Sequence, residues 1–333
     1  MSTIYVVEDY ATLRKHQQRL KIEKDENILL EIPIFKVEKI LLFGNIQITA
    51  DAIQMLLENN IDVSFYNVYG KLKGKLVNKF GKNIFLRLLQ YENYIDEEKR
   101  LNISKFIVSG KIKNFISFLG KYMRNHPEID FSKELKILNN FLILLQRKTH
   151  ISGCLGVEGI ATSVYYNCFK RMILNEDFME VFKERERRPP KDPINSMLSL
   201  GYSLITNEMW GIIDGMGYDP FIGFLHGINY GRPSLALDLI EQFRVSIVDR
   251  VVLEIINHRI IGIDEFEYDE VNGCRMKKEG IKKFFEHFDR RLNTKIVIAN
   301  EQEASYRKLF FLQAERFKET LLKGTEYKSF IYI

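Results

Sequence analysis

The sequence predicts an α+β protein, with a small β-rich amino-terminal domain over residues 1–82 and a larger all-α domain over residues 83–333. Three observations favour this fold class. Short runs of β-branched residues dominate the first eighty residues, and glycines mark the end of that region. Beyond residue 83, apolar residues recur at helical spacing. A length of 333 residues fits two domains.

The amino-terminal region is predicted to form strands around one short helix. A polar stretch over residues 24–27 between two apolar runs indicates a hairpin. Thr49 is a suitable cap for a helix that carries Ile53, Leu56 and Leu57 at helical spacing. The expected strands are Ile4–Val7, Arg19–Glu23, Ile28–Ile32, Val37–Phe43 and Val63–Tyr66.

The carboxy-terminal region is predicted to be helical, with apolar residues on one face of most segments. The proline-rich stretch Pro189–Pro193 must be a loop or the start of a helix. Residues 264–291 contain no informative motif. The expected helices include Ile112–Tyr122, Leu135–Leu145, Val157–Leu174, Ser234–Ile256 and Glu301–Leu322.

Composition limits the class of protein. The hydrophobic fraction is 46% and the charged fraction 28%, and no run approaches the roughly 18 apolar residues that span a bilayer. The first ten residues are acidic and do not resemble a secretory signal, so we expect a cytoplasmic protein without membrane contact. Three widely spaced cysteines predict reduced core thiols. A net charge of +5 is compatible with nucleic-acid binding without requiring it.

The predicted helix Ser234–Ile256 is apolar around most of its circumference and yet carries Asp238 and Glu241. A spacing of three residues places both carboxylates on one face, about one turn apart. Because burying two like charges is costly, a cation must compensate them. Either Arg244, three residues further on, or a metal ion fills that role, and the spacing alone favours the arginine.

His226 lies just before this helix, between Gly223 and Gly227. The glycines let the backbone turn sharply and leave room for another group to approach. A loop leads from His226 to the helix, so the imidazole is able to face Asp238 and Glu241. The alternative is a hydrogen-bonded core histidine, which is the more common role for a lone histidine.

Glu158 is the third candidate. Its segment is expected to be a helix with a small-residue face of Gly156, Gly159, Ala161 and Ser163, suited to close helix packing. The alternative is an exposed helix charge. Two carboxylates and an imidazole suit Mg²⁺ or Mn²⁺, whereas zinc normally takes more nitrogen or sulfur. Such ions in open sites serve phosphoryl transfer.

Several segments together resemble the integrase family of CRISPR adaptation, the Cas-one family. The resemblance covers most of the chain in the family's order. It includes the β-domain stretch Leu41–Leu76 and four helical-domain motifs, which are LGVEGIATSVYY at Leu155–Tyr166, DPINSMLSLGYSLI at Asp192–Ile205, GYDPFIGFLHG at Gly217–Gly227 and SLALDLIEQFR at Ser234–Arg244.

The resemblance implies the same two-domain fold and a metal-dependent DNA endonuclease and integrase. It implies that Glu158, His226 and Glu241 are catalytic metal ligands for Mg²⁺ or Mn²⁺, and that Asp238 is a further catalytic position in their outer shell. It also implies a homodimer, two of which are bridged by a small ferredoxin-like partner in a heterohexamer. That assembly inserts short duplex DNA fragments beside the leader of a CRISPR repeat array, through attack by their 3′-hydroxyls.

Two alternatives to this function stay open from the sequence. One is a metal-dependent nuclease of branched or single-stranded DNA acting in repair, which cuts without joining. The other is a non-catalytic helical scaffold whose acidic residues form salt bridges.

DNA of variable sequence must be held through its backbone, and basic residues are the candidates. The predicted contacts are Arg187, Arg188, Arg232 and Arg244, with Tyr165 two helical turns after Glu158. For each arginine the alternative is a solvated surface charge, and for Tyr165 it is a core aromatic. Further basic groups are Lys71, Lys73 and Lys75, predicted on one strand face, and the pairs Lys277–Lys278 and Lys282–Lys283.

Overall fold

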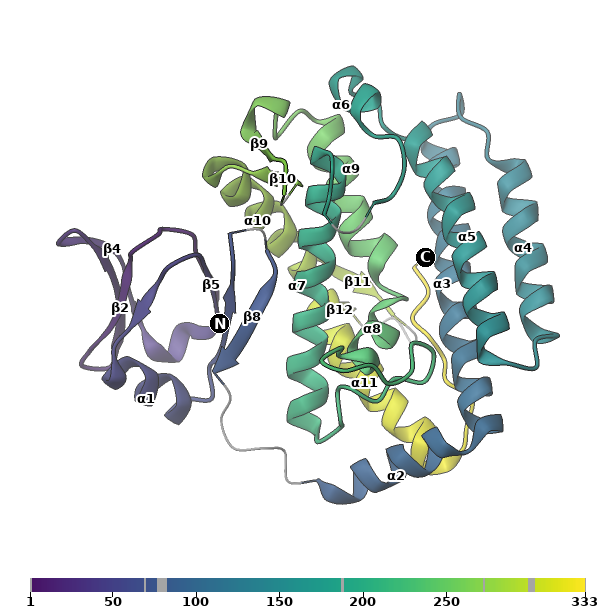
Figure 1. Cartoon of the computed structure of the whole chain (residues 1–333), viewed down its shortest axis with the longest axis horizontal. Helices are drawn as coiled ribbons and strands as arrows, with labels where there is room; N and C mark the ends of the chain where they lie inside the picture. Colours follow the sequence, from purple (N-terminus) through teal and green to yellow (C-terminus); the bar gives the residue numbers. More distant parts are fainter. Residues whose placement is uncertain are drawn as a thin grey trace.

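A computed structural model describes residues 2–68, 70–76, 83–186, 189–271, 273–298 and 303–332. A strand-rich amino-terminal part lies beside a larger helical part, as predicted (Figure 1). The change from strands to helices falls between Leu76, where β8 ends, and Ile84, where α2 begins.

The amino-terminal part contains two four-stranded sheets. In the first, of order β1–β5–β7–β8, β5 pairs in parallel with β1 and β7, while β8 is antiparallel to β7. The second has the order β4–β3–β2–β6. The strands are β1 (Ser2–Val6), β2 (Thr12–His16), β3 (Arg19–Lys24), β4 (Asn27–Pro33), β5 (Val37–Phe43), β6 (Gln47–Ile48), β7 (Asp62–Tyr66) and β8 (Leu72–Leu76).

The predicted hairpin and short helix are both confirmed. Strands β3 and β4 pair around Asp25 and Glu26, whose positive φ values of 48° and 66° suit a tight two-residue turn. Helix α1 (Ala50–Glu58) follows Thr49 and buries Met55 and Leu56 in a core shared with both sheets. A short 3₁₀ helix (Ile34–Lys36) leads into β5.

The helical part is organised around α7 (Pro193–Met216), which runs through the middle of the molecule between the sheets and the helices α3, α4 and α5 (Figure 1). The side chain of Asp192 caps α7, and Pro193 is its first residue, so the proline-rich stretch is the start of a helix. The other helices are α2 (Ile84–Ile95), α3 (Glu97–Asn125), α4 (Ser132–Gln146), α5 (Ile151–Arg171), α6 (Glu176–Val181), α8 (Ser234–Ile240), α9 (Arg250–Asn257), α10 (Lys278–Asn293) and α11 (Tyr306–Lys323).

Residues 234–256 do not form the single regular helix that was expected. Helix α8 ends at Ile240. Two hydrogen bonds between residues three apart follow, from Glu241 N to Asp238 O (3.4 Å) and from Phe243 N to Ile240 O (2.8 Å). A π-helical turn (Val245–Asp249) then leads into α9. Apolar periodicity does not reveal such a change of pitch, because most residues of the segment are buried. Irregular helical turns of this kind are frequent at functional sites.

The helical part also contains two small antiparallel hairpins that the sequence pattern did not predict. Strands β9 (Phe266–Asp269) and β10 (Gly273–Met276) follow a 3₁₀ helix (Ile263–Glu265), and β11 (Lys295–Val297) pairs with β12 (Glu303–Ser305). Strands of three or four residues are too short for alternation to be recognised.

Cys154, Cys168 and Cys274 are buried free thiols, as predicted. Among the described residues, no helix combines the length and apolarity needed to cross a membrane.

Candidate metal and nucleic-acid site

Two of the predicted ligands meet around a lysine. Glu158 projects from α5 and Glu241 from the turn after α8, and the ammonium of Lys111, on α3, lies between them. Lys111 Nζ donates to Glu158 Oε1 and lies 2.7 Å from Glu241 Oε2. Thr162, one turn along α5, also donates to Glu158 Oε1 at 3.0 Å. Three helices therefore converge on one positive charge.

The charges of this cluster are buried, and their mutual attraction lowers the pKa values of both carboxylates. The side chains of Lys111 and Glu241 are only 2% and 3% exposed, and that of Glu158 is 16% exposed. Burial alone would raise the pKa of Glu241, but the nearby charges of Arg244, Lys111 and His226 lower it to about 2. The pKa of Glu158 is also lowered, because the attraction of Lys111 outweighs its burial. Both carboxylates are thus held ionised.

Asp238 has a different role from Glu241, although only three residues separate them. Its buried carboxylate accepts backbone N–H groups from Phe224 (2.6 Å), Leu225 (3.0 Å) and His226 (3.1 Å). The expected sharing of one cation by Asp238 and Glu241 is not observed; Asp238 instead fixes the loop that carries the histidine. The histidine loop also packs closely on the start of α8, because a Cβ at Gly223 would lie 2.6 Å from the backbone carbonyl of Ser234.

His226 is oriented by the same carboxylate. Its Nδ1 lies 2.6 Å from Asp238 Oδ1, an arrangement that places the proton on Nδ1 and leaves Nε2 as an acceptor. Burial alone would lower the pKa of His226, but the hydrogen bond and charge of Asp238, together with Glu241, raise it. The protonated form of His226 is therefore stabilised by Asp238 and Glu241, whereas the neutral form has Nε2 as an acceptor.

The chemistry of these groups fits a hard divalent cation. An ammonium already lies between the two carboxylates, and Glu241 Oε2 is buried without a well-directed hydrogen bond despite its 2.7 Å ion pair with Lys111. A histidine held by a carboxylate through Nδ1 is the usual arrangement of a metal ligand. In the described part of the chain, no three His, Cys, Asp or Glu side chains converge closely enough to hold a metal ion. The metal site accordingly stays a prediction.

Arg244 extends the cluster into a buried polar network. Its Nη1 lies 3.5 Å from Glu241 Oε1, and its guanidinium lies 4.3 Å from the centroid of the Tyr202 ring. Tyr202 donates to Asp249 and lies 2.6 Å from the hydroxyl of Tyr166. The arginine partner that the helix spacing favoured is therefore present, together with a lysine that it did not predict.

The helix of Glu158 packs differently from the prediction. A Cβ added at Gly156 or Gly159 would meet nothing within 4 Å, so these glycines do not pack against another helix. Leu155 and Ile160 beside them are 37% and 56% exposed. The expectation of close helix packing is wrong for Gly156 and Gly159, whereas Ala161 of the same predicted face is fully buried in the core. The surface beside Glu158 is therefore open at the two glycines.

Tyr165 is a core aromatic, so the prediction of a DNA contact is wrong for this residue. It is fully buried, and its ring stacks on Phe115 with centroids 4.2 Å apart. Seven residues correspond to almost two full turns, so Tyr165 lies on nearly the same face of α5 as Glu158. Its ring is buried because that part of the face packs on Phe115 and Phe118 of α3.

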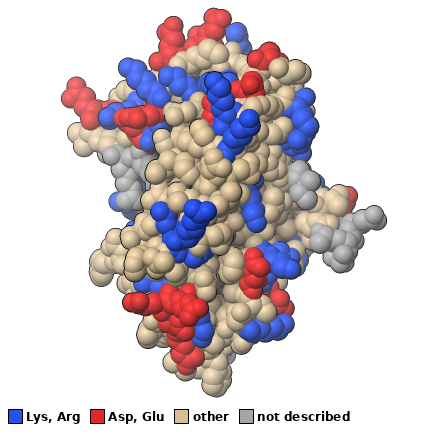
Figure 2. Space-filling view, turned by 90° about the vertical axis from the view of Figure 1, so that its right-hand side faces the viewer, with Lys and Arg blue, Asp and Glu red and all other residues tan. Residues whose placement is uncertain are grey.

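Among the predicted DNA-contacting arginines, Arg232 already has hydrogen-bond partners within the protein. Arg232 braces the histidine loop, since it donates to His226 O and, at 3.1 Å, to Ser234 Oγ. Arg187 and Arg188 lie outside the described residues. The face of α4 and α5 carries basic and acidic side chains interspersed around a broad uncharged area (Figure 2). The predicted DNA contacts at Arg187, Arg188, Arg232 and Arg244 stay predictions.

The predicted lysine groups are mostly paired within the protein. Lys75 does not join Lys71 and Lys73 on an open face; it donates to Asn207 O at 3.1 Å and lies over the Trp210 ring. The second cluster is neutralised by acidic residues. Lys278 and Lys282 pair with Glu8, Lys282 also with Glu279, and Lys283 with Glu265.

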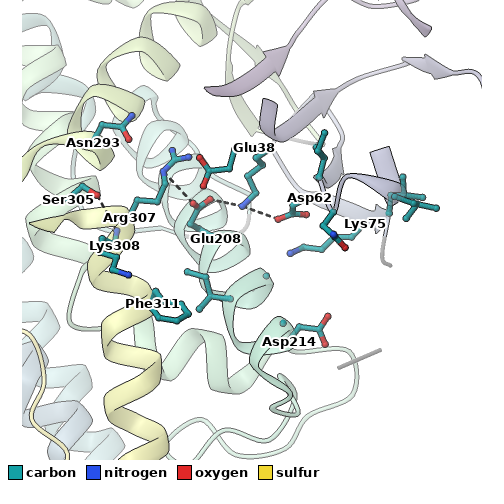
Figure 3. Close-up of a pocket in the computed structure, with 18 residues that line it drawn as sticks. Glu38, Asp62, Lys75, Glu208, Asp214, Asn293, Ser305, Arg307, Lys308 and Phe311 are labelled. Carbon is teal, nitrogen blue, oxygen red and sulfur yellow. Dashed lines mark hydrogen bonds and ion pairs between the residues drawn. The ribbon is translucent and has the colours of Figure 1, made fainter. Parts of the chain in front are cut away.

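A second buried ion cluster joins the two parts of the molecule. It lines a cleft of about 750 Å³ between β5, β7, β8, α7 and α11. Lys39 Nζ lies 2.6 Å from Glu208 and 3.1 Å from Asp62, and Arg307 lies 3.6 Å from Glu208 (Figure 3). Both carboxylates have lowered pKa values, because the attraction of Lys39 outweighs their burial. This cluster was not predicted.

Comparison with known proteins identifies the class. A family model described as CRISPR associated protein Cas1 matches residues 4–290. The chain is 33% identical over 325 residues to a CRISPR-associated endonuclease Cas1 of Thermus thermophilus, covering 97% of this chain and 94% of the relative. It is 32% identical to another from Moorella thermoacetica, covering 82% and 80%. The chain belongs to the Cas1 family.

Solved structures agree with this assignment. The fold matches a Cas1 protein from Thermotoga maritima with a TM-score of 0.85 and 26% identity, covering 99% of this chain and 100% of that one. A casposase bound to an integration product matches equally well, with a TM-score of 0.85 and 26% identity, covering 99% and 93%. The predicted family and fold class are thus confirmed.

Proposed function

We propose that this Cas1 protein is a divalent-metal-dependent DNA integrase that inserts short fragments into a CRISPR array. One observation carries the proposal: carboxylates from two helices, Glu158 and Glu241, converge on one buried cation beside His226. The similarity to a casposase bound to an integration product supports joining rather than cutting alone.

In this proposal Glu158, Glu241 and His226 would hold Mg²⁺ or Mn²⁺. The bound ion would polarise the scissile phosphate and stabilise the leaving oxygen. Asp238 keeps the imidazole oriented and its Nδ1 protonated. The exposed glycines of α5, Gly156 and Gly159, leave room for a DNA backbone to approach Glu158.

The reaction is a direct transesterification. The 3′-oxygen of the incoming fragment forms a bond to a phosphorus of the repeat, and the bond from that phosphorus to the repeat's own 3′-oxygen breaks. The attacking hydroxyl loses a proton and the leaving oxygen gains one, so the number of phosphodiester bonds is conserved. No protein nucleophile is required.

We also propose that the protein acts as a homodimer, with two dimers bridged by a small ferredoxin-like partner in a heterohexamer. Strand β4 supports self-association, because it lies at a sheet edge in the described part of the chain and exposes Ile28, Leu29 and Leu30. Light scattering of the isolated protein, and of its mixture with the partner, tests the two levels of assembly separately.

The function is tested by strand transfer from short duplexes with 3′-hydroxyl ends into a supercoiled target, with and without Mn²⁺. We expect E158Q and E241Q to reduce joining at least about a hundred-fold while DNA affinity changes little. Glu208 offers a matched control, because it is also a buried carboxylate paired with a lysine, and E208Q should join DNA at the wild-type rate per folded molecule.

Two outcomes would contradict this proposal. Cut products without joined products would indicate a repair nuclease that acts on branched or single-stranded DNA. Full joining activity in E158Q, or in wild type without any divalent ion, would remove these carboxylates from the mechanism.

A further inference from the structure

Lys111 is an unusual residue at its position. It is a lysine in the middle of α3 and is 1% exposed, although lysine is almost never fully buried without a partner. Its ammonium contacts the two carboxylates that the proposed function assigns to the metal. The role inferred for Lys111 rests on that proposed function and concerns the response of the lysine when a metal ion binds.

The backbone around Lys111 is held rigidly against the carboxylate segment. Asn114, one turn further along α3, is buried and donates to Gln242 O at 2.9 Å, directly after Glu241. The same amide donates to Phe330 O at 2.8 Å in the carboxy-terminal segment. Because α3 is fixed here, the ammonium is able to leave the carboxylates only through rotation of its own side chain.

A divalent cation and the ammonium compete for the same oxygens. Glu158 and Glu241 supply two negative charges, and Lys111 together with Arg244 already balances them. A metal ion coordinated by both carboxylates would be repelled by an ammonium at contact distance, and this repulsion is strong where water is excluded. Occupancy by one cation therefore disfavours occupancy by the other.

We propose that Lys111 is an internal cation that holds the metal site closed and sets its affinity for Mg²⁺ or Mn²⁺ by competition. In the metal-free protein it neutralises Glu158 and Glu241 and prevents their mutual repulsion. Metal binding displaces the ammonium towards the more exposed side of the cluster, where the Glu158 side chain is 16% accessible. Lys111 is thus a positioning residue rather than a metal ligand.

The two parts of this role are separable by substitution. Methionine is unbranched and fills a similar volume without charge, so K111M removes the competitor. Arginine keeps the charge and presents a fork of donors that suits carboxylates, so K111R strengthens the competitor. The expected order of Mn²⁺ affinity is K111M, then wild type, then K111R, with K111M about ten-fold tighter than wild type.

The experiment is a thermal unfolding titration of the full-length protein with Mn²⁺, checked by isothermal calorimetry. Without metal, K111M should melt several degrees below wild type, because only Arg244 then balances Glu158 and Glu241. Saturating Mn²⁺ should recover most of that loss. The matched control is K39M, which removes the lysine of the other buried cluster. K39M should have a lower melting temperature than wild type but the same Mn²⁺ affinity.

The outcomes distinguish this inference from the metal site itself. An absence of Mn²⁺ binding to wild type and K111M alike would overturn both. A second outcome would overturn the role of Lys111 alone. In that outcome wild type binds Mn²⁺ and E241Q does not, but the Mn²⁺ affinity of K111M is equal to or weaker than that of wild type. If K111M does not fold, K111R decides the matter, because an affinity equal to or higher than that of wild type contradicts competition.

Discussion

In the described part of the chain, two buried lysines lie in clusters of nearly identical composition. Lys39 lies between Asp62 and Glu208 with Arg307 alongside, and Lys111 lies between Glu158 and Glu241 with Arg244 alongside. The first cluster connects β5 and β7 to α7 and α11, across the two parts of the molecule (Figure 3). The second connects three helices within one part.

What separates the two clusters is their surroundings. Beside Glu158 lie a histidine loop pinned by a buried aspartate and an open helix face with two glycines. Around Glu208, Arg307 instead continues the network to Asp289 at 2.9 Å. The Lys111 cluster thus has an imidazole beside its paired charges, whereas the Lys39 cluster, although it lines a cleft, has none among its described partners. The same residue types make a structural connection in one place and a candidate metal site in the other.

The largest difference is expected on removal of a carboxylate from the connecting cluster. E208A leaves Lys39 with Asp62 alone and deprives Arg307 of one partner, so we expect a loss of about 3–5 kcal/mol in the free energy of unfolding. Urea denaturation measures this loss. The shift in melting temperature caused by Mn²⁺ should equal that of wild type, and a reduced shift would show that the two clusters are not independent.

The next effect concerns pH. The folded pKa of Glu241, about 2, lies below its ordinary value of 4.5, so its ionised form stabilises the fold above pH 4.5 and this stabilisation is lost as pH falls towards 2. Wild type should therefore exceed E241Q by about 3 kcal/mol at neutral pH. Urea titrations in metal-free buffer from pH 7 to pH 2.5 should show the gap narrowing below pH 4.5. A constant gap would mean that charge is not its cause.

Asp249 provides a control of opposite sign in the same network. Burial raises its pKa to about 6, above the ordinary 3.8, although hydrogen bonds from Tyr202 and Tyr165 partly oppose the shift. Its ionisation in the unfolded chain alone makes wild type lose stability as pH rises from about 4 to 6. The difference in stability between wild type and D249N should therefore move in favour of D249N over that interval.

The sequence predicted elements whose signals are local. The hairpin of β3 and β4 follows from two apolar runs around a polar turn, and the proline-rich stretch 189–193 indicated a loop or the start of a helix, which is where α7 begins. The convergence of Glu158 and Glu241 required the resemblance to a family, since periodicity does not place distant helices side by side. The family of the chain is confirmed, whereas the role of Glu158 and Glu241 as metal ligands stays a prediction.

Other features lacked a local signal. Lys111 is 47 residues from Glu158 and lies in an amphipathic helix where a lysine normally faces solvent. The pitch change after Glu241 is hidden because most residues of that segment are buried. Asp238 and Glu241 share a helical face by spacing, yet Asp238 binds the histidine loop whereas Glu241, in the turn after α8, binds Lys111. Tertiary contacts, rather than composition, assign these roles.

Asp238 gives the smallest of the expected effects and the most specific test of how the clusters differ. D238N retains an oxygen that accepts from the loop backbone, but it removes the charge that holds the proton on His226 Nδ1. Loss of such a carboxylate behind a metal-binding histidine typically weakens metal affinity 10–100-fold, or about 1.4–2.8 kcal/mol. Calorimetric titration with Mn²⁺ measures the loss, and D62N is the counterpart in the connecting cluster, where the affinity should not change. Equal Mn²⁺ affinity in D238N and wild type would mean that His226 is not a ligand, and the candidate metal site would then reduce to its two carboxylates.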